Sequence, residues 1–296
     1  MRTWLSLILF FVFTAQNFAQ SPPGSDIYLV NLTPAATQIG AVQNISNHPG
    51  YDNQPAFLPD NSGLLYTAMR DSSQTDVFMF EMKNSKTTQL TRTTESEFSP
   101  TPLSIDPLIL STVRVEADGA QRLWSYNAAE SEFSLLLPSI QPVGYHAWAD
   151  STKLALFVLG EPHELVTVDL VTKAPMKITS DIGRCLQKIP GETAVSFVQK
   201  TPEHAPRIKS VNLNTGTVTD IAPTLADGED YVWFDETTLL MGLGAKIYRI
   251  KRQSNENWVE FLDLEPYGIT SIMRLALSPD KNYLAFVADD AVVKKN

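Results

Sequence analysis

Residues 54–67 read QPAFLPDNSGLLYT, and residues 275–288, near the other end of the chain, read LALSPDKNYLAFVA. Each stretch has apolar residues before a Pro-Asp turn and a second apolar run after it, which is the pattern of two short strands joined by a turn. A chain that contains the same phrase near both ends is expected to be built from internal repeats. The apolar residue before each turn, called the anchor below, therefore measures the repeat.

Six copies of this phrase lie along the chain at a nearly constant spacing. AWADSTKLAL (147–156) matches VWFDETTLLM (232–241) position by position, and PLSIDPLIL and KIPGETAVSF supply two weaker copies. Successive anchors are separated by 46, 45, 41, 44 and 44 residues. The anchors are Phe57, Leu103, Trp148, Ile189, Trp233 and Leu277.

The first five copies each continue with a third and a fourth strand. The third strands align as TDVFMFEM, QRLWSYNA, HELVTVDL, PRIKSVNL and AKIYRIKR. The sixth copy, which starts at Met273, has only two strands, and SDIYLVNL (25–32) with TQIGAVQ (37–43) can supply its missing half. The sequence therefore predicts an all-β fold, a six-bladed β-propeller of four-stranded blades whose last blade is closed by the N-terminal strands.

Closure of the last blade has a physical reason, because an open ring would leave unpaired strand edges and uncovered blade faces. A two-sheet sandwich is the alternative, but it explains neither the constant period nor the split sixth copy. The predicted blade cores are 54–91, 100–137, 145–179, 185–221, 231–262, and 273–288 together with 25–43.

Residues 1–19 have the features of a secretory signal peptide. Arg2 precedes an apolar run from Trp4 to Phe13, and a short polar stretch then ends at Ala19. The run is too short to span a bilayer, and no later apolar stretch is long enough to do so. We therefore expect residues 20–296 to form a single exported propeller domain, periplasmic or extracellular, with no integral membrane segment.

The composition restricts the partners. The formal net charge is −10, and an acidic protein repels nucleic acid and anionic membrane surfaces. Cys185 is the only cysteine, so no intramolecular disulfide can form, and a buried, inert thiol is expected there. We expect a monomer that binds no nucleic acid.

The repeat is similar to that of a known family. YDNQPAFLPDNSGLLYTAMRDSSQTDVFMFEMKNSKTTQLT resembles the repeat of TolB-like propellers, a phrase of the form D-x-x-P-x-aromatic-S-P-D-G, a strand, R-D, a D-I-Y strand and L-T. SPDKNYLAFVA and SDIYLVNL resemble the two halves of another copy, so the resemblance covers residues 25–288. The glycine of the turn is replaced by Asn61 in the first copy. The resemblance implies the fold and an exported location. It does not extend to the Tol envelope machinery, because TolB carries a separate domain before its propeller.

No enzyme motif is present in the sequence. It contains no G-x-S-x-G, H-E-x-x-H, C-x-x-C or P-loop pattern, so we predict no catalytic residue, cofactor or metal ligand. The connectors that enter the innermost strands of a propeller meet at one end of its channel, where groups from distant parts of the sequence can form a concave site. Each copy supplies one ionisable residue there. These residues are Asp52, Glu97, His146, Arg184, Asp230 and Arg274.

Two interpretations of these six residues remain open. They can bind a polar ligand or a peptide segment, or they can pair with one another and with channel water. The leading hypothesis is a non-enzymatic binding or scaffold propeller that recognises a protein segment or a small polar ligand through Arg184, Arg274 and His146. An unperturbed histidine pKa of about 6.5 would then make binding sensitive to pH. The alternative is a lyase-type or lactonase-type propeller enzyme that acts on a small molecule or saccharide with a cation in the channel.

Overall fold

The structure is a computed structural model that describes residues 23–32, 39–71, 74–226, 228–254 and 257–289. The predicted signal peptide lies outside these residues. Apart from one short 3₁₀ helix, η1 (Glu265–Tyr267), the regular structure of the described residues consists of β-strands. No helix in this part of the chain has the length and hydropathy of a membrane-spanning segment.

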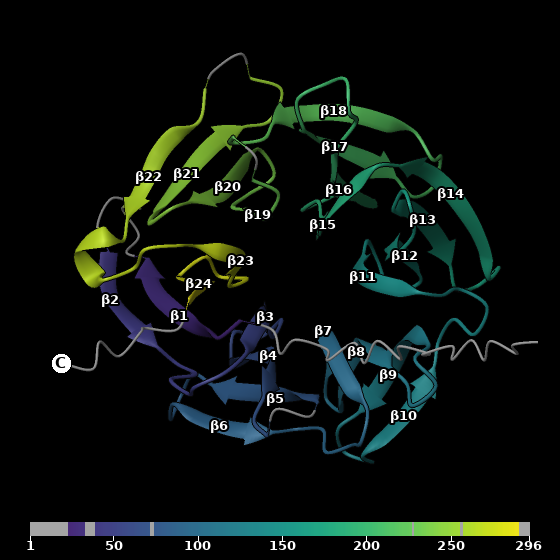
Figure 1. Ribbon diagram of the computed structural model, residues 1–296, viewed down its shortest axis with the longest axis horizontal. Helices are drawn as coiled ribbons and strands as arrows, with labels where there is room; N and C mark the ends of the chain where they lie inside the picture. The colour runs from purple at the N-terminus through teal and green to yellow at the C-terminus, as the bar shows by residue number, and fades with distance from the viewer. Residues whose placement is uncertain (1–22, 33–38, 72–73, 227, 255–256, 290–296) are drawn as a thin grey trace, which may run out of the picture.

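The described residues form six four-stranded antiparallel sheets arranged as blades around a central axis (Figure 1). This confirms the predicted six-bladed propeller. Blade 1 contains β3 (Asp52–Phe57), β4 (Gly63–Met69), β5 (Thr75–Glu81) and β6 (Lys86–Gln89). Blade 2 contains β7 (Ser96–Ile105), β8 (Leu108–Val115), β9 (Gln121–Asn127) and β10 (Glu132–Leu135). Blade 3 contains β11 (Val143–Trp148), β12 (Lys153–Val158), β13 (Glu164–Asp169) and β14 (Ala174–Ser180). Blades 4 and 5 contain β15 (Ile182–Lys188), β16 (Ala194–Gln199), β17 (Arg207–Asn212) and β18 (Val218–Pro223); and β19 (Tyr231–Trp233), β20 (Thr238–Leu243), β21 (Lys246–Lys251) and β22 (Val259–Asp263).

Blade 6 is built from both ends of the chain. Its strand order is β2-β1-β24-β23, from β2 (Ile39–Asn44) at the rim to β23 (Met273–Leu277) at the channel. β1 (Ser25–Leu32) lies antiparallel to β24 (Tyr283–Asp289) over the whole of its length but the last residue. The predicted pairing of the N-terminal strand with the strand around residues 284–287 is therefore confirmed.

The core lies between neighbouring blades. Strands in the middle of a blade are apolar on both faces because each face packs against another blade; all six residues of β16, for example, are buried. The rim strand β14 instead exposes its first four residues. Each junction between two blades contains one cluster of buried apolar side chains among the described residues. Burial of this kind is the main stabilising contribution in a chain without disulfides.

The second copy of the repeat departs from the expected pattern. β7 runs two residues past the expected anchor Leu103, and Leu103 is 39% exposed, whereas Phe57 is 8% exposed and Ile189 is fully buried. Two register shifts against β8 account for the longer strand, since each bulge adds a residue without a partner. The repeat is present, but Leu103 is not a core position.

Candidate functional site

The central channel is surrounded by the innermost strand of each blade. Figure 1 shows β3, β7, β11, β15, β19 and β23 facing one another across the middle of the ring. A cavity of about 700 Å³ lies between them. We call the end at which these six strands begin the channel mouth.

The innermost strands are irregular near the mouth. A bulge redirects a side chain and interrupts regular pairing. The register shifts lie between Asn53 and Ala56, Phe98 and Thr101, Val143 and Tyr145, Ile182 and Leu186, and Met273 and Leu275.

Three of these bulges contain a strained residue that lines the cavity. The φ angles of Gln54, Ser99 and Arg274 are 58°, 54° and 28°, in the left-handed region that favours glycine. Such a conformation costs about 1–3 kcal/mol and is maintained only where the surroundings determine it. Strain at equivalent places in three blades points to a role for this wall of the channel.

Arg184 on β15 forms the main ion pair of the mouth. Its Nη2 lies 2.5 Å from Oδ2 of Asp230, and its Nε lies 3.5 Å from Oε1 of Glu229. Glu229 also pairs with Lys200 at 2.7 Å. The side chain of Arg184 is 37% exposed, so solvent screens these pairs and their contribution to the free energy of unfolding is small. Their main effect is to fix the position of the guanidinium group.

Arg274 on β23 has a different environment. Its Nη2 donates a hydrogen bond of 2.9 Å to the hydroxyl of Tyr145, and its guanidinium carbon lies 5.0 Å from the centre of the same ring. Among the described residues, no carboxylate forms an ion pair with Arg274. Tyr51 lies nearby, and burial raises its pKa to about 12 in spite of the opposing influence of Arg274 and Arg184. Arg274 is therefore a half-buried cation beside neutral phenols, with donors left for an anion.

His146 on β11 lines the cavity but is 7% exposed. Its Nε2 lies 2.7 Å from the hydroxyl of Ser111 in blade 2, which also accepts a hydrogen bond of 2.9 Å from Trp148. Burial lowers the pKa of His146 to about 3. The expectation of a histidine that titrates near neutral pH is thus wrong, because the ring is removed from water and stays uncharged.

Asp52 and Glu97 are fully buried and do not line the cavity. Asp52 lies 2.7 Å from Arg70, and Glu97 accepts hydrogen bonds from Thr91 and Thr93. Both side chains turn away from the channel into the junctions on either side of blade 1. The fold therefore brings four of the six predicted residues to the cavity, Arg184, Asp230, Arg274 and His146, and places the other two behind its wall.

The sequence analysis did not identify Tyr51, Tyr145 or Glu229, which lie beside the two arginines of the mouth. A signal for Tyr145 was present. It lies three residues before the anchor Trp148, as Asp230 and Arg274 lie three residues before theirs. Gln54 occupies the same place before Phe57, and all four residues line the cavity.

No family model matches this chain, and no curated protein matches it. Solved structures do. A protein assigned as TolB from Agrobacterium tumefaciens superposes with a TM-score of 0.69 at 11% identity, over 91% of this chain and 99% of that one. TolB from Acinetobacter baumannii gives a TM-score of 0.56 at 12% identity, over 90% of this chain and 64% of that one.

An enzyme has a similar fold. An oligogalacturonate lyase in complex with manganese superposes with a TM-score of 0.57 at 12% identity, over 89% of this chain and 82% of that one. At such identities the likeness shows the fold alone. The fold is that of a TolB-like six-bladed propeller.

Proposed function

We propose that this chain is an exported, non-enzymatic binding propeller that holds an anionic group of a protein segment, or of a small polar ligand, at its channel mouth. The leader-like residues 1–19 and the TolB-like fold support export and a binding role. Function has to be argued from the site, since one propeller fold serves many activities.

The observation that carries the proposal is the environment of Arg274. A half-buried guanidinium group normally has a carboxylate partner, because an unpaired charge removed from water is costly. Arg274 instead bonds to the neutral hydroxyl of Tyr145. A carboxylate or phosphate that entered the cavity would accept two parallel hydrogen bonds from the guanidinium group of Arg274.

Arg184 provides a second cation in the same cavity. Asp230 and Glu229 pair with it and hold its guanidinium group in position at the cavity. A ligand anion can share Arg184 with Asp230 or compete with it. The two arginines come from blades 4 and 6, which allows an extended acidic segment to contact both.

The donor set supports binding rather than cation-assisted lyase chemistry. Such chemistry needs several histidine and carboxylate ligands directed at one point. No group of three or more His, Cys, Asp or Glu residues with that arrangement occurs in the described part of the chain. Nε2 of His146 is directed at Ser111, and Asp230 at Arg184.

Arg274→Ala is expected to weaken binding by about 1–3 kcal/mol, the size of a hydrogen bond to a charged group, with little change in the free energy of unfolding. The measurement is affinity capture from the native envelope fraction with wild type and variant as parallel baits, followed by titration of the captured partner. Arg184→Ala is also expected to weaken binding of the captured partner.

Lys281→Ala is the matched control, because this exposed lysine lies in the turn at the far end of β23 from the mouth. It should capture the same partners as wild type. Equal recovery with Arg274→Ala and Arg184→Ala, both folded, would place the binding site elsewhere.

A further inference from the structure

Two consecutive blade junctions contain the same buried polar network. At the junction of blades 6 and 1, Ser25 at the start of β1 donates to the carbonyl oxygen of Asp52 at 2.9 Å. The next residue, Asp26, accepts a hydrogen bond of 3.0 Å from Ser46. Asp52 in turn pairs with Arg70 of its own blade at 2.7 Å.

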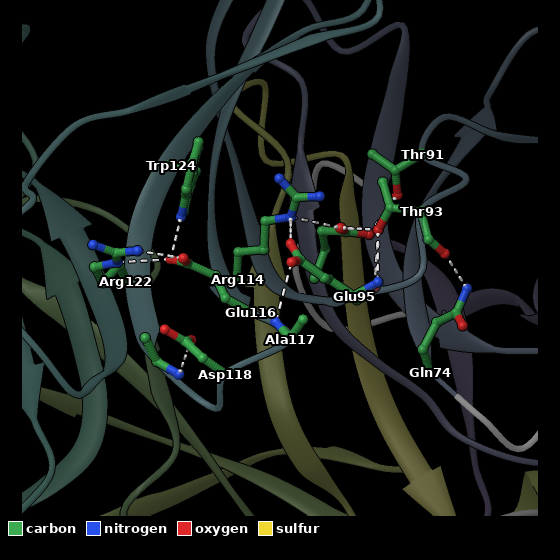
Figure 2. A network of polar contacts seen from close by, with 12 residues as sticks. Gln74, Thr91, Thr93, Glu95, Arg114, Glu116, Ala117, Asp118, Arg122 and Trp124 are labelled. Atoms are coloured by element: carbon green, nitrogen blue, oxygen red, sulfur yellow. Dashed lines mark hydrogen bonds and ion pairs between the residues drawn. The ribbon is translucent and has the colours of Figure 1, made fainter.

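The junction of blades 1 and 2 repeats these contacts. Thr75 at the start of β5 donates to the carbonyl oxygen of Glu97 at 3.0 Å. The hydroxyl of Thr91 lies within hydrogen-bonding distance of both Asp76 and Glu97, at 3.3 and 3.0 Å. Arg114 lies 3.4 Å from Glu97. Figure 2 shows Glu95 next to Arg114, with Thr91 and Thr93 of blade 1 beyond it on the same side.

We call the two sets the junction triads, namely Asp26–Asp52–Arg70 and Asp76–Glu97–Arg114. They flank blade 1. In the other four third strands, the place of Asp26 and Asp76 is taken by Arg122, Glu164, Arg207 and Lys246, and Glu164 is half-exposed and pairs with Lys177.

Each triad lies directly behind a strained part of the channel wall. Gln54 comes two residues after Asp52, and Ser99 comes two residues after Glu97. Both have left-handed φ angles, and both precede a proline. Oε1 of Gln54 also accepts a hydrogen bond of 2.8 Å from the backbone N–H of Ser99, which joins the two bulges. The buried acid thus lies where it can stabilise a costly backbone conformation.

The charges of each triad do not balance when every carboxylate is ionised. Besides Arg70, the neighbours of Asp52 are Asp26 and the phenol of Tyr66. Asp26 also accepts a hydrogen bond from the backbone N–H of His48. Neither carboxylate oxygen of Asp52 accepts a well-aligned hydrogen bond in the described structure. Asp52 therefore faces one guanidinium group and a second carboxylate in a site removed from water, which favours the protonated form of Asp52.

The second triad has a larger excess of acid. Glu97 faces Asp76 and Arg114, and Glu95 pairs with the same arginine at 2.7 Å. Burial raises the pKa of Glu97 to about 7 and that of Asp52 to about 6. Burial also raises the pKa of Asp76.

We propose that the junction triads are a pH-responsive device that fixes the channel wall of blades 1 and 2 in mild acid and loosens it as the buried acids ionise. A carboxyl group with a raised pKa in the folded state binds a proton more tightly there than in the unfolded chain. Its contribution to stability is complete below about pH 4, near the pKa values of unfolded Asp and Glu. It is lost as the pH rises through the folded values of about 6 and 7.

The test is hydrogen exchange measured by mass spectrometry at pH 5 and pH 8, corrected for the intrinsic increase of exchange rate with pH. In the wild type we expect residues 51–57 and 96–101 to exchange at least about tenfold faster at pH 8, since one pKa unit corresponds to a factor of ten. Strand β16, whose residues are all buried in blade 4, provides the internal reference.

Two variants separate the triads. In Glu97→Gln the pH dependence of 96–101 should disappear while that of 51–57 remains, and Asp52→Asn should give the reverse. Glu116→Gln is the control, since Glu116 lies in the same blade 2 network but a hydrogen bond from Arg122 lowers its pKa. Equal corrected exchange at both pH values in the wild type, or an unchanged pH dependence in both variants, would overturn the proposal.

Discussion

A chain that lacks residues 25–44 is expected to lose its cooperative unfolding transition and to aggregate. The deletion removes β1 and β2 and leaves β24 without its antiparallel neighbour. β1 alone buries four apolar side chains, Ile27, Leu29, Val30 and Leu32, each worth about 1.5–3 kcal/mol. Their sum is comparable with the whole free energy of unfolding of an ordinary domain, about 5–15 kcal/mol. Far-UV circular dichroism during urea titration checks the transition.

A circular permutant provides the matched control, because it keeps every strand of the fold. Asp289 pairs with Ser25, so a short flexible linker can join β24 to β1 as a hairpin. The permuted chain starts at Ile45, runs to Asp289 and continues through the linker into residues 25–44. It should unfold cooperatively, close to the wild type. A deletion variant that stays soluble with an unchanged midpoint would contradict the structural role of the N-terminal strands.

Phe286→Ala is expected to lower the free energy of unfolding by about 3–5 kcal/mol. Phe286 is fully buried on β24, and its ring stacks on that of Tyr28 in β1 with centres 5.4 Å apart. Truncation leaves a cavity at the strand pair that closes the ring, and the surrounding strands cannot collapse into it without losing register. For a domain of this size the melting temperature should fall by about 6–20 °C, measured by calorimetry.

Phe261→Ala is the comparison for this substitution. Phe261 packs against the same apolar cluster from the rim strand β22, but it is only partly buried. Its removal should cost clearly less than that of Phe286. Similar losses of unfolding free energy in the two variants would show that packing around β24 contributes no more to stability than packing at the rim.

The architecture could be predicted from the sequence because repeats leave a local signature. The turn phrase, the third strands and the half copy at each end are patterns of neighbouring residues, and their spacing does not depend on tertiary contacts. The pairing of Ser25–Leu32 with Tyr283–Asp289 follows from counting strands in a closed ring. The second copy shows the limit of this reasoning, since the two bulges of β7 could not be inferred from PLSIDPLIL.

The site could be predicted only in part. The search for one ionisable residue near each anchor found Arg184, Asp230, Arg274 and His146, and Arg184 lies five residues before its anchor, Ile189, rather than three. A fixed position, three residues before the anchor, would have added Tyr145 and would have replaced Asp52 with Gln54. The prediction selected residues because they are ionisable, whereas the alternation of side chains between the two faces of a strand decides which residue reaches the channel.

The sequence by itself determined the repeat, the number of blades and the closure of the ring, because these depend on periodic apolar residues and turns. The tertiary structure decided which way each polar side chain points and how much water reaches it. A bulge after Asp52 and another after Glu97 turn Gln54 and Ser99 into the cavity and leave the acids between blades. Burial then decides the charge state of those acids, as it does for His146. Desolvation depends on every neighbour in space, and most of those neighbours are distant in the chain.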